Sequence, residues 1–284
     1  MSLFSNRNRY VLALLVGFFI PISTALTNIL CVLVLLFLLF EGNHKQKLKV
    51  LLSNPIALAA LMLFLLILLG LFYSSASFSD ASRTLSKYRE FFYIPLFLLL
   101  FQDSTSRLWG LYGFLSAMAL TLFISYFTAI TGWEIIEGSI LNGAVFKNYI
   151  TQNLLMALVV YFLTVQLWTE KSWKWIRGLI ILLTIYNILF MNQGRTGYII
   201  LFCLIILLCY QLYHLRGVLI ASLLLVISSV LLYSSSSVLQ QRIDVISSDL
   251  HRYQQGEMIL SSDRNIEIIL EYERLLPLYL EGLV

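Results

Sequence analysis

The chain has 284 residues, of which 60% are hydrophobic and only 12% are charged, and its mean hydropathy is +0.86. A soluble domain carries about 25% charged residues, so this composition excludes a soluble globular protein and predicts an integral membrane protein. The net charge of +4 is modest, and the basic residues form no dense patch with interleaved aromatic residues, which argues against nucleic-acid binding.

The apolar segments are long and continuous, which favours membrane-spanning helices over a barrel of alternating strands. We therefore expect an all-α fold, a polytopic transmembrane helical bundle that forms one domain over residues 1–233. A spanning helix needs about 20 apolar residues, within a range of about 17–25. On this basis nine spans are predicted, at 9–22, 25–41, 56–74, 91–101, 109–130, 150–168, 175–192, 197–213 and 217–233.

The orientation follows from Lys and Arg, which are enriched in short cytoplasmic loops. With a cytoplasmic N-terminus, ten basic residues lie inside: Arg7, Arg9, Lys45, Lys47, Lys49, Arg107, Lys171, Lys174, Arg177 and Arg216. Five lie in outer loops before residue 234: Arg83, Lys87, Arg89, Lys147 and Arg195. The bias predicts an inner N-terminus and, with nine spans, an outer C-terminus.

Residues 234–284 are more polar than the rest and form a predicted outer tail. In the stretch "NIEIILEYERLL", Ile266, Ile269, Leu270 and Leu276 recur at helical spacing and share one face. We therefore expect an outward-facing amphipathic C-terminal segment.

Among the cations predicted in outer loops, the position of Arg195 is the hardest to explain without a functional role. It lies in "MNQGRTGYII", a very short outer turn with no acidic residue near it in the sequence. Gly194 and Gly197 allow the backbone to bend there. The planar donor fork of arginine matches phosphate oxygens, so the position suits an anion clamp at the membrane surface.

Other outer cations are candidates for the same anion site. Arg83, Lys87 and Arg89 lie in one outer loop, and Lys147 lies beside Asn148 in the next. The alternative for each is that its stem covers apolar surface while the charge reaches lipid phosphates, or that it pairs with a nearby acid.

Other chemistry finds little support in the sequence. The three cysteines lie in apolar runs, where they act as small hydrophobic residues, so neither a disulfide nor a metal site is predicted. His44 and His214 fall in inner loops, and His251 is interpreted as a solvated residue of the tail. Metal-ligand spacings and nucleotide-type glycine loops are absent, so no metal or other cofactor is expected.

Three segments resemble the O-antigen ligase and O-antigen polymerase family of bacterial inner membranes. They are a short outer turn with an arginine, "FMNQGRTGYIILF"; an outer loop that leads into a span, "GSILNGAVFKNYITQNLLMALVVYF"; and an amphipathic stretch opened by a second arginine, "SSDRNIEIILEYERLLPLY". Together they cover roughly residues 70–280 of the sequence.

The resemblance implies a metal-independent membrane glycosyltransferase that uses no nucleotide sugar. Such an enzyme takes a glycan from undecaprenyl diphosphate at the periplasmic face of the inner membrane. A ligase hands it to the lipid A core during lipopolysaccharide biosynthesis, and a polymerase to another glycan. By position, Arg195 and Arg264 would hold the diphosphate and serve catalysis, while Lys87, Arg89, Arg83, Lys147 and Asn148 would extend the substrate site.

The sequence departs from the family at its C-terminal end. Members have a longer outer loop with a late histidine that acts in catalysis. Here His251 precedes Arg264, so the catalytic role of that histidine is not transferred to His251. We expect a C-terminally shortened member whose residues 234–284 are an incomplete periplasmic loop, either active or inactivated by the shortening. The alternatives are an O-antigen polymerase, a non-catalytic membrane protein, and a lipid or polysaccharide transporter; a transporter is disfavoured because the spans carry almost no ionisable residues.

Overall fold

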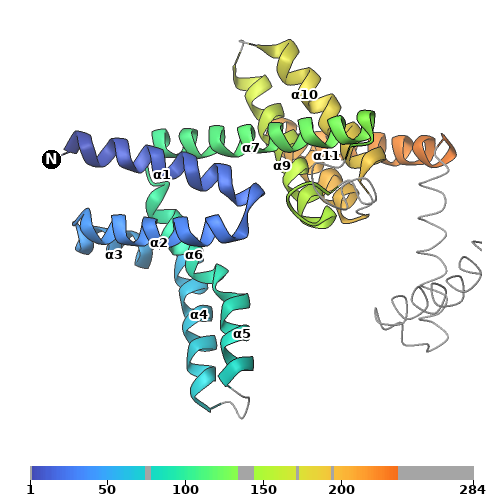
Figure 1. The fold of residues 1–284 in the computed structure, drawn as a ribbon. Helices are drawn as coiled ribbons and strands as arrows, with labels where there is room; N and C mark the ends of the chain where they lie inside the picture. The colour runs from blue at the N-terminus through green and yellow to red at the C-terminus, as the bar shows by residue number, and fades with distance from the viewer. Residues whose placement is uncertain (1, 74–77, 134–143, 171–172, 193–194, 236–284) are drawn as a thin grey trace, which may run out of the picture. The chain divides into compact units, whose positions relative to one another are not determined.

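Figure 1 shows the fold in a computed structural model, which describes residues 2–73, 78–133, 144–170, 173–192 and 195–235. These residues are almost entirely helical and contain no strand, so the all-α fold class is confirmed for this part of the chain. Contacts divide the chain into two compact units, Met1–Leu208 and Cys209–Val284. The predicted boundary between a membrane domain and a tail at residue 233 stays a prediction, and residues 236–284 lie outside the described residues.

The first unit begins with helices joined by short polar turns. The Ser23 hydroxyl accepts a hydrogen bond from the Leu26 amide (3.3 Å) and caps α2. Asn54 accepts bonds from two amides at the start of α4, where Pro55 takes the first helical position. The bounds are α1 (Ser2–Ile22), α2 (Thr24–Phe40), α3 (His44–Ser53), α4 (Pro55–Tyr73), α5 (Phe78–Tyr88) and α6 (Glu90–Leu100).

Further helices complete this unit. The Asp103 carboxylate accepts a bond from the Ser106 amide (2.8 Å) and caps α7, which ends at Gly132 in a left-handed conformation (φ 68°). The helices are α7 (Ser104–Thr131), α9 (Tyr149–Thr169), α10 (Lys174–Tyr186), the π-helix η1 (Asn187–Met191) and the beginning of α11 (Arg195–Ser235). Within the second unit α11 is interrupted at His214, where φ is 54° and ψ is −146°. The sequence places a turn between two spans at this position.

Helices α1 and α7 lie side by side (Figure 1) and approach each other closely through glycines. A Cβ atom at Gly17 would overlap the carbonyl oxygen of Gly110, and one at Gly113 would overlap the carbonyl oxygen of Leu14. Small residues allow this kind of close backbone approach between membrane helices. These three glycines therefore set the separation of α1 and α7.

Two apolar cores fill the first unit. One is shared by α1, α2 and α6 and includes Val16 and Leu100; the other is shared by α7, α9, η1 and α11 and includes Met156 and Ile188. The outer helix surfaces are also apolar, and side chains such as Leu66 are more than half exposed. A surface of this kind suits contact with lipid tails rather than with water.

Among the described residues, four helices are long and apolar enough to cross a membrane: Ser104–Thr131, Tyr149–Thr169, Lys174–Met191 and Gly197–Leu219. A fifth arises if α3 and α4, which meet at a bend of 95°, form one broken span. The chain therefore has the apolar helices of a membrane protein. Nearly all described residues of the nine predicted spans are helical, but the number of spans and the side that the C-terminus faces stay predictions.

Helices α3 and α5 lie in segments that the hydropathy pattern assigned to loops. Both are short and rich in polar or charged residues, with Lys45, Lys47 and Lys49 on α3 and Arg83 and Lys87 on α5. A search for about 20 consecutive apolar residues does not detect such helices, because they carry too few apolar positions.

Candidate functional site

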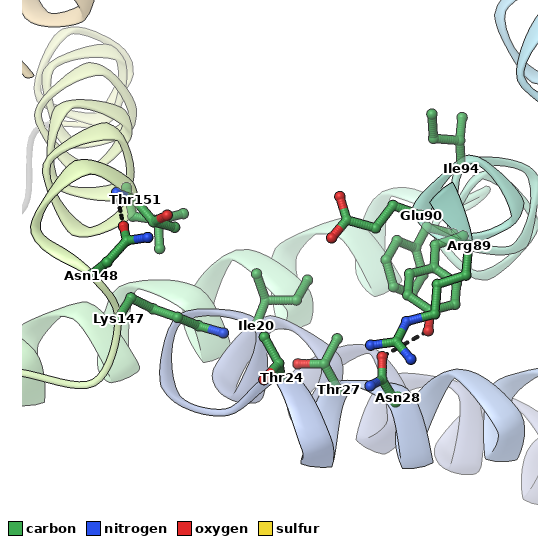
Figure 2. Close-up of a pocket in the computed structure, with 13 residues that line it drawn as sticks. Ile20, Thr24, Thr27, Asn28, Arg89, Glu90, Ile94, Lys147, Asn148 and Thr151 are labelled. Carbon is green, nitrogen blue, oxygen red and sulfur yellow. Dashed lines mark hydrogen bonds between the residues drawn. The ribbon is translucent and has the colours of Figure 1, made fainter. Parts of the chain in front are cut away.

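A pocket of about 490 Å³ lies in the first unit between the α1–α2 turn, the start of α6 and the start of α9 (Figure 2). This volume falls within the roughly 300–1,000 Å³ typical of small-molecule sites. Its lining consists of Ile20, Thr24, Thr27, Asn28, Arg89, Glu90, Tyr93, Ile94, Phe97, Lys147, Asn148, Thr151 and Leu155. The pocket thus combines apolar side chains with charged, hydroxyl and amide groups.

Lys147 enters the pocket from the segment before α9. Gln152 is buried, and its side-chain oxygen accepts a bond from the Val145 amide (2.8 Å), which fixes the backbone two residues before the lysine. Asn148, the next residue, caps α9 by accepting a bond from the Thr151 amide (2.8 Å). Local hydrogen bonds therefore hold the base of the lysine side chain in place.

Lys147 is half-buried, and its ammonium group makes no hydrogen bond or ion pair within the described residues. Burial lowers the pKa of Lys147, and the nearby Glu90 carboxylate raises it in part, so that the pKa lies below its usual value. A cation kept from water without a direct partner favours the approach of an anion.

Arg89 enters from the opposite wall, at the junction of α5 and α6 (Figure 2). Its Nη1 donates a bond to the Ser86 hydroxyl (3.3 Å). Close by, the Tyr93 hydroxyl donates to Asn28 Oδ1 (2.7 Å), which joins α6 to α2 beneath the arginine. The contact between these two helices therefore positions the guanidinium group at the pocket.

The structure brings together some of the residues predicted for the site. Arg89, Lys147 and Asn148 line the same pocket, whereas Arg83 and Lys87 are exposed on α5 and do not line it. The Lys87 ammonium lies 5.9 Å from the centre of the Tyr88 ring. Arg195 is the first residue of α11 but its side chain lies outside the described residues, as does the whole of Arg264.

The backbone at Arg195 borders the helix that carries part of the pocket. Gly197, two residues further on, is buried, and a Cβ atom there would lie 2.6 Å from the Cβ atom of Asn153 on α9. Because α9 begins beside Lys147 and Asn148, the start of α11 packs within two turns of these residues along α9. This packing brings the backbone of Arg195 to the same end of α9 as the pocket.

A buried polar network precedes that turn. Asn187 Nδ2 donates to Ser125 Oγ (2.8 Å), and Asn192 Nδ2 donates to Asn187 Oδ1 (2.9 Å). All three residues are at least 96% buried, and Asn187 begins the π-helix η1. Short π-helices often occur at functional sites. Sequence reasoning missed this network, although Asn187 and Asn192 stand out as amides in an apolar stretch.

A second charged cluster lies at the other end of α1 and α2. Glu41 pairs with Arg9 (2.7 Å) and with Lys47 (2.9 Å), and Arg9 also lies 3.6 Å from Asp103. The sequence analysis predicts Arg9 and Lys47 on the inner side and the pocket cations Arg89 and Lys147 on the outer side. The structure groups them in the same two sets, while the identity of the cytoplasmic side stays a prediction.

In the described part of the chain, no three His, Cys, Asp or Glu side chains gather as metal ligands would. Comparisons with protein-family models, with curated proteins and with solved structures found no match.

Proposed function

We propose that the protein is a membrane glycosyltransferase that takes a glycan from undecaprenyl diphosphate, with the Arg89–Lys147 pocket as the diphosphate site. The observation that supports this proposal is the composition of the pocket. Two cations from segments far apart in the sequence line it together with apolar side chains that include Ile20, Phe97 and Leu155. A ligand with an anionic head and an apolar tail satisfies both parts of this lining.

The cations would act on the leaving group of the reaction. As the glycosyl bond breaks, negative charge grows on the diphosphate, and donors already in place stabilise it without reorganisation. Arg89 offers a planar fork of donors, and Lys147 offers a compact charge. We assign Arg195 to the same leaving group because Gly197, two residues after it, packs against Asn153 near the start of α9. Arg264 is assigned on the basis of the sequence resemblance alone.

The acceptor in this proposal is the lipid A core, as in O-antigen ligases of lipopolysaccharide biosynthesis. The protein would then lie in the bacterial inner membrane with nine spans and with the pocket on the periplasmic face. An O-antigen polymerase uses the same donor and would need the same pocket, so the two reactions differ in the acceptor.

Binding of the donor lipid tests the pocket directly. Purified protein in detergent should bind undecaprenyl diphosphate, and Lys147→Ala and Arg89→Ala should each weaken binding about 10-fold or more, as expected for a hydrogen bond to a charged group worth about 1.5–3 kcal/mol. Lys45→Ala is a matched control, because Lys45 is exposed on α3 outside the pocket. Undecaprenol, which lacks phosphate, should bind weakly to all four proteins. Equal binding of the two lipids by the wild-type protein would contradict the proposal.

Transfer tests the reaction itself. Expression in a ligase-deficient bacterial strain should restore long-chain lipopolysaccharide, and the pocket variants should reduce it at equal protein level. A wild-type chain that binds the donor but restores nothing would reject the ligase reaction and leave only the lipid site.

A further inference from the structure

Glu90 is the only carboxylate among the 13 residues that line the pocket. It is the first residue of α6 and directly follows Arg89, so the same helix junction delivers a cation and an anion to one wall. In Figure 2 the Glu90 carboxylate and the Lys147 ammonium group extend from opposite walls toward the same space. Glu90 was not among the residues singled out from the sequence.

The carboxylate of Glu90 is exposed in the pocket and, within the described residues, makes no hydrogen bond or ion pair. It nevertheless acts on Lys147, whose pKa it raises. A carboxylate that supports the fold is normally held by a direct partner, as Glu41 is by Arg9 and Lys47. The carboxylate of Glu90 is instead available to a ligand.

A negative charge is unfavourable in a pocket that binds diphosphate, because it repels the ligand in the ground state. Glycan transfer, however, needs a group that removes a proton from the acceptor hydroxyl. The other polar lining groups are hydroxyls, amides and cations, and none of these is an effective proton acceptor near neutral pH. Glu90 is the lining group suited to that task.

We infer that Glu90 is the general base of the transfer reaction, a conclusion that rests on the proposed function. The acceptor hydroxyl oxygen forms a bond with the anomeric carbon of the donor sugar, and its proton passes to the Glu90 carboxylate. The bond between the anomeric carbon and the diphosphate oxygen breaks, and its electron pair leaves with the diphosphate, next to Arg89 and Lys147. No oxidant, reductant or further reactant is needed.

The test separates binding from transfer. Glu90→Gln keeps the size of the side chain but removes its charge and its capacity to accept a proton. It should bind undecaprenyl diphosphate at pH 7 at least as tightly as the wild-type protein, because a repulsive charge is lost. Its rate of lipopolysaccharide formation should fall by about 10²–10⁴-fold, the usual contribution of acid–base catalysis. Glu90→Asp should keep part of the rate.

Asp80→Asn is the matched control, since Asp80 is an exposed carboxylate on α5 outside the pocket and its loss should leave transfer unchanged. The melting temperature of each purified variant reports whether it folds. A Glu90→Gln protein that folds and transfers at the wild-type rate would overturn the role of Glu90 alone. Weakened donor binding by Glu90→Gln would also overturn it, in favour of a structural role. Wild-type protein that neither binds the donor nor transfers a glycan would overturn the proposed function, and the role of Glu90 with it.

Discussion

Nη2 of Arg9 lies 2.7 Å from each carboxylate oxygen of Glu41, although the two residues are 32 positions apart. The side chains are only 12% and 15% exposed, so the pair is largely removed from water. Lys47 approaches the same carboxylate and also donates to the Leu38 carbonyl oxygen (2.5 Å). One carboxylate therefore ties α1, the end of α2 and α3 together.

Replacement of this carboxylate should destabilise the protein. Glu41→Gln leaves the cations of Arg9 and Lys47 partly buried without their charged partner, and we expect a cost of about 1.5–3 kcal/mol. The control is Glu170→Gln, because Glu170 pairs with Arg177 but its side chain is 46% exposed, and such pairs contribute about 0–1 kcal/mol. Thermal unfolding in detergent measures both variants. Equal losses would show that burial of the Arg9–Glu41 pair adds nothing.

The same carboxylate predicts how stability depends on pH. Burial alone would raise the pKa of Glu41, but hydrogen bonds from Arg9 and Lys47 outweigh it, so the pKa falls below its usual value of 4.5. The stabilisation is therefore complete above about pH 4.5 and is lost as the pH falls through the lower, folded-state pKa. The difference in melting temperature between wild type and Glu41→Gln should be constant from pH 7 to 5 and shrink below pH 4.5. A difference that grows in acid would contradict this assignment.

The contact of α1 with α7 predicts which glycines tolerate alanine. Gly17→Ala and Gly113→Ala place a methyl group against a backbone carbonyl that cannot move aside without shifting a helix. Such overpacking typically costs about 1–3 kcal/mol. Gly178→Ala on α10 is the control, because no atom beyond its own turn of helix lies within 4 Å of the added methyl group. Its melting temperature should match or exceed that of the wild type, and equal losses in all three variants would reject the close α1–α7 contact.

Long helices could be predicted from the sequence because an apolar run of spanning length has few alternatives to a helix in lipid. The site was harder to predict from the sequence. Arg89 and Lys147 were predicted as candidates because basic residues are unusual in outer loops, but they lie in different loops and nothing in the sequence shows that they line one pocket. Glu90, Asn28 and Tyr93 could not be predicted for the site, because their role depends on the packing of α6 against α2 and on the pocket that they share with the start of α9, and no local pattern encodes such an arrangement. Arg83 and Lys87 were predicted for the site because they share a loop with Arg89. In the structure they lie on α5 and do not line the pocket.

The lowered pKa of Lys147 predicts how donor binding depends on pH. Because the pKa lies below 10.5, the ammonium group loses its proton at a lower pH than an exposed lysine would. Binding of undecaprenyl diphosphate should therefore weaken as the pH rises toward the usual lysine value of 10.5, and Lys147→Arg, which stays charged, should bind nearly independently of pH over this range. Glu90→Gln removes the charge that raises the pKa of Lys147, so its binding should weaken at a lower pH than in the wild type. Identical pH profiles for the three proteins would exclude Lys147 from the anion site.

The proposed role of Arg195 requires an arginine side chain, and a lysine at this position should not replace it. Lysine keeps the charge of arginine, but its compact ammonium group cannot donate parallel hydrogen bonds to two diphosphate oxygens as a planar guanidinium group does. Arg195→Lys should therefore lose nearly as much transfer as Arg195→Ala, about 10²–10³-fold, as expected when one donor to a developing charge is removed. Since the fork matters most when charge builds on the leaving group, the loss should appear in the rate of lipopolysaccharide formation more than in donor binding. Arg107→Lys is the control, because Arg107 is exposed and donates to the carbonyl oxygens of Phe101 and Gln102 at the start of α7, outside the pocket. Near-normal transfer by Arg195→Lys would reject the two-oxygen contact, and normal transfer by Arg195→Ala would leave Arg195 only an interaction with lipid phosphates at the membrane surface.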